Sequence, residues 1–189
     1  MEILLNILII WLIAELGSAV VHWAEMRYGN AEWKDSKNWL KRKIYEEVIG
    51  PNVAHHSRPS LMNEGTFWFR NRSSIVPAFI LAGLSFLFWP TYWSVYCGFI
   101  LLGFSNQIHG FAHLPKNKSN WLIRFFQRIG IFQSPKHHKT HHTSPFDCNF
   151  AVCTNYLNPV LEFIRFWAIL EFIVWLIFGL KPLKSRESA

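Results

Sequence analysis

Charged residues are scarce in this sequence. Asp, Glu, Lys and Arg make up 16% of the 189 residues, whereas hydrophobic residues make up 51%. Soluble domains carry about 25% charged residues, so the shortage indicates a chain that is embedded in a lipid bilayer. The ten tryptophans agree with this interpretation, since tryptophan is enriched at membrane–water interfaces.

Cysteines are also few. The three present, Cys97, Cys148 and Cys153, are an odd number without a Cys-x-x-Cys pair, which excludes a disulfide framework or a zinc ribbon. No aromatic RNA-binding pattern or DNA-recognition helix is found, so nucleic acid is not an expected partner. The net charge of +7 instead favours an anionic membrane surface as the partner. The length predicts one domain, residues 1–189.

Long apolar runs predict the membrane spans. The first, residues 3–21, would cover about 28 Å as a helix, close to the ~30 Å hydrocarbon core. A cleaved signal peptide is the alternative, but Glu2 stands where a basic region is expected. The second run is interrupted by Pro90. Proline breaks a helix, so we expect two helices, 75–89 and 91–113, with a re-entrant hairpin as the alternative. The last run is 160–180.

The sequence therefore predicts an all-α integral membrane protein with about four transmembrane helices. Both ends of the chain would lie on one side, and the long polar segments 22–74 and 105–159 on the other. Fifteen of the nineteen Lys and Arg fall within these two segments. By the positive-inside rule, both segments face the cytoplasm.

Nine histidines gather in or beside the same two segments, and so predict a cytoplasmic histidine-rich cap. They are His22, His55, His56, His109, His113, His137, His138, His141 and His142. A lone histidine is more often structural than a ligand. Nine at one membrane face exceed the three or four ligands of one zinc site and are enough for two metal ions.

Spacing strengthens this prediction. His109 and His113 are four residues apart and share one helix face, and the motif His-His-x-x-His-His at 137–142 repeats that spacing twice. Ser134 and Pro135 are a typical cap and first residue of a helix, so a short helix over 135–143 would present up to four imidazoles. Imidazole suits Zn, Cu, Fe and Ni.

The order of these residues resembles the Kua family, which includes plasmanylethanolamine desaturase, bacterial light-response relatives and plant plastid desaturases of phosphatidylglycerol. The resemblance extends over most of the chain. The matching residues are Glu15, Ser18, His22-Trp23, Gly29, His55-His56, Pro59, Asn71, Asn106 to His109, His113, Gln127, Lys136 to His138, His141-His142, Ser144-Pro145, Leu157-Asn158 and Leu161-Glu162.

This resemblance implies an enzyme, an O2-dependent lipid desaturase with two iron ions held by the nine histidines. Its substrate would be a phospholipid, with the double bond placed in an alkyl-ether or acyl chain. Electrons would come from an external donor of the cytochrome b5 or ferredoxin type. Animal members have further histidines where this chain has Gly65, Gly130 and Phe146, so those are not taken as ligands. Met26 stands where they have an acid.

Three polar residues are candidate partners that orient the ligands. Glu15 lies two helical turns before His22 and would accept a hydrogen bond from a ligand imidazole, or else be protonated between helices. Asn106 would bind a metal-bound water or cap a turn, and Asp147 would be a partner or a turn residue. Glu171, inside the last run, has the same two interpretations as Glu15.

Other functions share these features. A lipid hydroxylase would use the same metal site and differ only after the first hydrogen is removed. A metal transporter would place its ligands near the bilayer midplane, whereas these histidines gather at one face. A non-catalytic metal-binding regulator is the third alternative.

Overall fold

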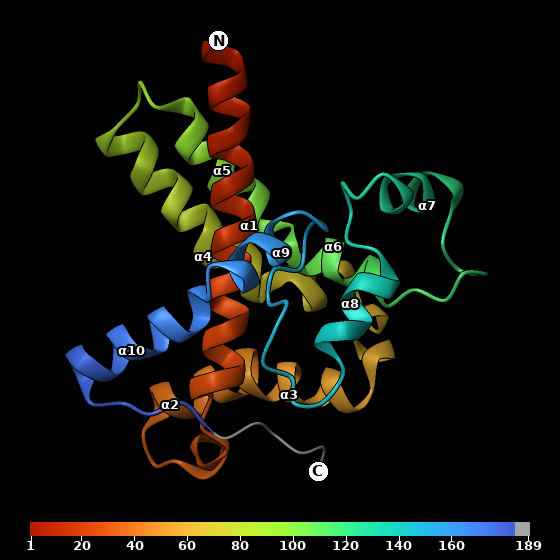
Figure 1. Ribbon diagram of the computed structural model, residues 1–189. Coiled ribbons are helices and arrows are strands. Elements are labelled where there is room, and N and C mark those ends of the chain that lie inside the picture. Colours follow the sequence, from red (N-terminus) through yellow and green to blue (C-terminus); the bar gives the residue numbers. More distant parts are fainter. Residues whose placement is uncertain (184–189) are drawn as a thin grey trace.

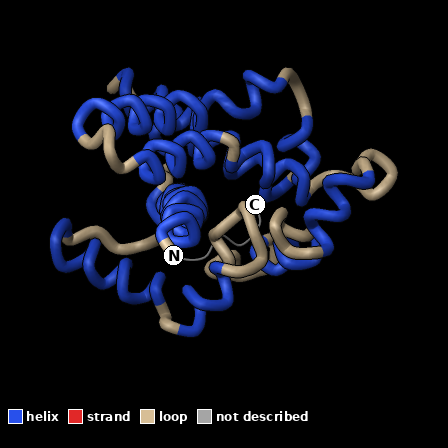
Figure 2. The backbone as a smooth tube through the Cα atoms, turned by 90° about the horizontal axis from the view of Figure 1, so that it is seen from above, coloured by secondary structure: helices blue, strands red, loops and turns tan. Residues whose placement is uncertain are grey.

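The computed structural model describes residues 1–183, and within them the chain is helical and has no strand. Figure 1 shows α1 as the central axis of the molecule, and Figure 2, which looks down from the end where α1 begins, shows the other helices arranged around it. The four longest helices are α1 (Glu2–Tyr28), α4 (Phe67–Phe88), α5 (Trp93–Gly103) and α10 (Phe166–Phe178). The shorter ones are α2 (Trp39–Ile44), α3 (Gly50–Ser57), α6 (Ser105–Ala112), α7 (Trp121–Arg128), α8 (Pro135–His141) and α9 (Leu157–Phe163), with the turns η1 (Ala31–Asp35), η2 (Tyr45–Ile49) and η3 (Pro59–Asn63).

The α4–α5 hairpin packs beside the amino-terminal half of α1 (Figure 1). Glycine makes the close approach of α1 and α5 possible, as is common where helices pack in membranes. A Cβ atom on Gly98 would lie 2.8 Å from the Cβ of Ile13, and one on Gly17 would lie 2.9 Å from Leu102 Cδ2. Both glycines therefore stand where a larger residue would push the two helices apart.

The predicted break at Pro90 is confirmed, because α4 ends at Phe88 and α5 begins at Trp93. The predicted helix 91–113 is divided at Phe104 into α5 and α6. Ser74 Oγ donates a hydrogen bond of 2.8 Å to the carbonyl oxygen of Gly103 at this division, so a carbonyl left without a helical partner is satisfied.

Two helices, α1 and α4, are long and apolar enough to cross a membrane. The apolar helices α5 and α10 have only 11 and 13 residues. A helix of 13 residues is about 20 Å long, shorter than the ~30 Å hydrocarbon core, so the prediction of four crossings is not confirmed. Arg165 has a left-handed backbone (φ 56°) that separates α9 from α10. The Leu183 N–H donates to the Arg27 carbonyl, which places the last described residues beside the carboxyl-terminal end of α1.

An irregular segment, residues 146–156, closes the core beside the second half of α1. Phe150 and Ala151 are fully buried there. Two amides replace the missing secondary structure: Asn158 accepts from the Ala151 N–H and donates to its carbonyl, and Gln133 Nε2 donates to the same carbonyl. A buried loop needs such partners for its backbone groups, and here they hold the chain next to the histidines.

Candidate metal centre

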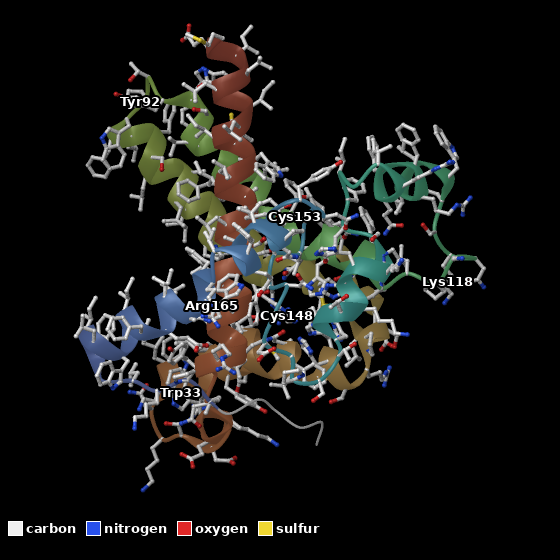
Figure 3. All side chains as sticks on the ribbon, in the orientation of Figure 1. Trp33, Tyr92, Lys118, Cys148, Cys153 and Arg165 are labelled. Carbon is white, nitrogen blue, oxygen red and sulfur yellow. The ribbon has the colours of Figure 1, made fainter. Side chains whose placement is uncertain are left out.

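Eight of the nine predicted histidines meet in one cluster between α1, α3, α6 and α8. They are His22, His55, His56, His109, His113, His138, His141 and His142. Figure 3 shows side-chain nitrogen atoms gathered between α1 and α8 at this level. Residues from four separated stretches of the chain thus come together as the sequence predicts, at the carboxyl-terminal half of α1.

Local sequence explains how α8 contributes to the cluster. The helix begins at Pro135, as predicted, and Ser134 Oγ accepts a hydrogen bond of 3.2 Å from the His137 N–H. The capped helix directs His138 and His141, both buried, toward the centre of the molecule. His141 Nδ1 lies 2.7 Å from the Cys148 carbonyl oxygen. A carbonyl accepts only, so Nδ1 carries the proton and Nε2 keeps a free lone pair.

The first group of imidazoles is a triangle. The Nε2 atoms of His109, His113 and His138 lie 2.9, 2.9 and 3.2 Å from one another. A neutral imidazole nitrogen either donates or accepts a hydrogen bond, so hydrogen bonds cannot close all three sides. Three nitrogens bound to one ion at about 2.0–2.1 Å would lie about 2.9–3.4 Å apart. The spacing fits ligands around one metal ion.

The second group contains His22, His56 and His141. The Nε2 atom of His141 lies 2.7 Å from that of His22 and 3.2 Å from that of His56. The second of these separations lies within the range for ligands that share an ion, and the first is slightly shorter. The two groups use different residues of α8, so the cluster contains two separate sets of imidazoles.

His55 and His142 lie between the two groups. Ligand nitrogens of both lie within 4.8 Å of those of the first triangle, and His55 has the same relation to His22 and His56. Their ring nitrogens are buried and have no close hydrogen-bond partner among the described residues, apart from weaker interactions of His55 with the backbone of Asn52 and of His142 with the backbone of His56. Buried polar atoms normally have partners, so these two imidazoles have nitrogens available for a metal ion.

The charge state of the cluster suits metal binding. Burial, followed by the neighbouring imidazoles, lowers the pKa of His55 and His138 well below its ordinary value. Burial lowers the pKa of His113 to about 3 and that of His142 to about 4. The rings are therefore neutral near pH 7, the form in which imidazole binds a metal.

His137 is the predicted ligand that the structure does not bring into the cluster. Its Nε2 atom lies 3.1 Å from Asn158 Nδ2, which donates to it. Adjacent residues on a helix point about 100° apart, and with His138 and His141 directed to the cluster, His137 lies on the side of α8 that faces α9. His137 connects α8 to α9 instead.

The predicted orienting residues have different positions. Asn106 lies beside His109 in the wall of a cavity, and its Nδ2 donates to the Arg70 carbonyl and to Ser73 Oγ. Glu15 is fully buried, but the candidate metal-binding groups among the described residues do not include it. Asp147 is exposed.

The structure gives roles to two further acids, Glu171 and Glu25, that the sequence did not predict. Glu171 forms an ion pair of 2.7 Å with Arg27, so it is neither a ligand partner nor an isolated protonated acid. Glu25, which sequence reasoning missed, has Oε2 3.8 Å from His22 Nδ1. Its position three residues after His22, on the same helix face, is the signal that would have identified it.

Two cavities meet at the cluster. The larger, about 350 Å³, has His22 and His109 in its wall, together with charged residues of both signs: Arg70, Arg72, Glu25, Glu46, Glu47 and Glu64. The smaller, about 130 Å³, shares His22 and His109 and is lined by apolar residues such as Leu81 and Leu102 as well as by several serines. A highly charged space and a smaller space with few charges therefore adjoin the same two imidazoles.

Comparison with known proteins identifies relatives of this arrangement. A family model described as the lipid desaturase domain matches residues 11–185. Fatty acid desaturase 4-like 1, chloroplastic, of Arabidopsis thaliana is 29% identical over 94% of this chain and 58% of its own length. Plasmanylethanolamine desaturase 1 of Mus musculus is 27% identical over 90% of this chain and 64% of its own length.

A bacterial relative, plasmanylethanolamine desaturase of Myxococcus xanthus, is 23% identical over 93% of this chain and 62% of its own length. The chain thus spans about three fifths of the length of these curated relatives. No solved structure matches.

Proposed function

The chain belongs to the lipid desaturase domain family, and we propose that it carries an O2-dependent lipid desaturase activity with two iron ions in its histidine cluster. The observation that carries this proposal is the division of the cluster into two groups of Nε2 atoms 2.7–3.2 Å apart. The desaturase names of the relatives support the choice of reaction.

The donor set fits two ions of a metal that accepts imidazole. His109, His113 and His138 would hold one ion, and His22, His56 and His141 the other. His55 and His142 would add a fourth nitrogen to each. Imidazole alone does not separate iron from zinc or copper. Iron is proposed because O2 activation needs a redox-active metal, which zinc is not.

The reaction converts –CH2–CH2– in a lipid chain into –CH=CH–, and O2 with two electrons and two protons becomes two molecules of water. When bound, the iron pair would supply the oxidising power that removes hydrogen from an unactivated C–H bond. The protein would bind the substrate, exclude water from the reacting carbons and hold the imidazoles in place. The two electrons would come from an external donor, of the cytochrome b5 or ferredoxin type.

The two cavities fit a phospholipid substrate. The smaller cavity, beside Leu81 and Leu102, would receive part of a hydrocarbon chain, in an alkyl-ether or acyl lipid. The larger cavity would hold the headgroup. Arg70 lies in its wall and would bind the phosphate, as guanidinium groups do, whereas Arg72 is paired with Glu47 at 2.7 Å. Both cavities adjoin His22 and His109, so a chain that passes from one to the other would cross the metal centre.

Membrane placement follows from the same arrangement. We propose that α1 and α4 cross the bilayer, since both are long and apolar enough to do so. The histidine cluster would lie on the cytoplasmic side, where the positive-inside rule places the basic segments. That α5 and α10 also cross the bilayer, which would make four crossings, remains a prediction.

Metal content and lipid products test the proposal together. Purified protein should contain about two irons per chain, one for each of the two sets of histidines. Cells that express it should accumulate lipids that are lighter by two hydrogens, and the His138→Ala variant should produce none. A gain of one oxygen would instead indicate a hydroxylase. Active protein that contains zinc alone would refute the iron centre.

A further inference from the structure

Helix α7 (Trp121–Arg128) stands out from the body of the molecule (Figure 1). Its inner face is attached by Gln127, whose Nε2 donates to the carbonyls of Phe111 and Gln133 at 3.0 and 3.3 Å. Phe126 adds a ring contact with Phe132 at 5.1 Å. The arm is therefore an ordered part of the fold and not a free loop.

The outer face of α7 is apolar and exposed. Trp121, Leu122 and Phe125 expose 71%, 45% and 50% of their surface. On a helix with about 100° per residue, these three side chains fall in one sector, opposite the buried Gln127. Ile129 and Ile131 extend the same patch beyond the helix and are 40% and 47% exposed. The arm thus has one apolar face packed on the protein and a second that no described residue covers.

Positive charge surrounds this patch. Lys116, Lys118 and Arg128 are exposed next to it, and Figure 3 shows Lys118 at the outer edge of the arm. Between Glu64 and Asp147 the sequence contains no acidic residue. The arm therefore complements a surface that is negative at its boundary and apolar beneath.

We propose that residues 115–131 form an interfacial arm that places the Trp121 and Phe125 rings in the bilayer and binds anionic phospholipid headgroups through Lys116 and Lys118. Helices with one aromatic face and flanking cations lie in the membrane interface in this way, and tryptophan favours that depth. Figure 1 places α7 level with the apolar α4–α5 pair along the axis of α1, where a bilayer crossed by α1 and α4 would lie. An acidic protein would pair with the lysines but leave the aromatic face in water.

Photo-crosslinking tests this proposal. A benzophenone amino acid replaces Phe125 in the full chain, which is reconstituted in vesicles of phosphatidylcholine and phosphatidylglycerol. Glu32, next to the Trp33 labelled at the opposite end of the molecule in Figure 3, is exposed and serves as the control site. We expect lipid adducts at position 125 and none at position 32. Unchanged metal content in each variant would show that the fold is intact.

Charge reversal then tests the headgroup preference. Each cation near an anionic membrane surface changes binding about fivefold. Lys116→Glu with Lys118→Glu should therefore lower phosphatidylglycerol adducts at position 125 by at least about fivefold and leave phosphatidylcholine adducts in place. If both lipids form adducts equally, and the charge reversal does not change this, the anionic preference is refuted. Adducts to another protein, or no adducts at all, would refute the proposal that residues 115–131 lie in the membrane interface.

Discussion

The two halves of α1 have opposite surfaces. In the amino-terminal half, Ile3 and Leu4 each expose 72% of their surface. In the carboxyl-terminal half, Glu15, Ser18 and His22 are 0%, 5% and 6% exposed. One helix therefore has its aliphatic residues outside and its ionisable residues inside.

This reversal separates two tasks. An aliphatic surface costs nothing in lipid, so the face of the first half that the α4–α5 hairpin leaves uncovered needs no further protein around it. Burial of polar groups costs free energy unless they have partners, so the second half requires the histidines and amides that surround it and, in our proposal, metal ions. The difference predicts that substitutions in the second half change metal binding, whereas substitutions in the first half change little within the protein.

The largest effect is expected at the histidine groups. His138→Ala removes a ligand from one group and His141→Ala from the other, so each should lose about one of two metal ions. Activity should fall by more than the ~100-fold that loss of a ligand's hydrogen-bond partner can cause. Elemental analysis of purified variants, together with lipid product analysis, measures both quantities.

His137→Ala is the matched control, because His137 lies on the same helix but contacts Asn158. It should keep both ions. Loss of metal in His137→Ala equal to that in His138→Ala would contradict the proposed division into eight ligands and one structural histidine.

The second-largest effect is expected from acid, which should destabilise the metal-free protein. Burial holds the pKa of His113 at about 3 and of His142 at about 4, whereas histidine in an unfolded chain titrates near ~6.5. Between these values the unfolded chain binds protons that the folded protein does not, so stability falls as pH drops from ~6.5 to ~4. The expected loss is about 1.4 kcal/mol per histidine and pH unit. Thermal unfolding of chelator-treated protein at several pH values measures it, and a midpoint that does not change would refute the neutral cluster.

The sequence predicts the helical class, the break at Pro90 and the cap of α8, because these features depend on local residues. It does not predict the length of the last helices. Arg165 adopts a left-handed backbone that divides an apolar run, and hydropathy has no information about that conformation. The ion pair of Glu171 with Arg27 likewise joins residues 144 positions apart, beyond any spacing rule.

At the site, spacing within one helix predicts His109 with His113 correctly. It gives no direction for His137, whose partner Asn158 is on another helix. Glu25 was missed because its importance depends on two cavities and the His22 ring that adjoin it. The gathering of the histidines was thus predictable from sequence, and the directions of their side chains required the tertiary structure.

A smaller effect is expected at Glu25, whose carboxylate faces the Nδ1 atom of His22. A carboxylate beside a ligand imidazole fixes the ring and raises its basicity, and its loss typically weakens metal binding 10–100-fold. Glu25→Leu should therefore lose metal to a competing chelator about tenfold more readily, and Glu25→Gln less so. Glu171→Gln is the control, since Glu171 pairs with Arg27. Equal metal retention in Glu25→Leu and the control would leave Glu25 without this role.

The smallest effect is expected on the outer half of α1, and a pair of opposite substitutions measures the contrast directly. Leu8 is 46% exposed, whereas Ala19 is fully buried among residues that include Trp23 and Phe150. Leu8→Ala should change the free energy of unfolding by less than about 0.5 kcal/mol, because it removes no packing partner. Ala19→Leu should cost about 1–3 kcal/mol, because a filled core has no room for three more carbons. If Leu8→Ala proved as destabilising as Ala19→Leu, the exposed face around Leu8 would have to pack against protein, and its aliphatic surface would no longer indicate lipid.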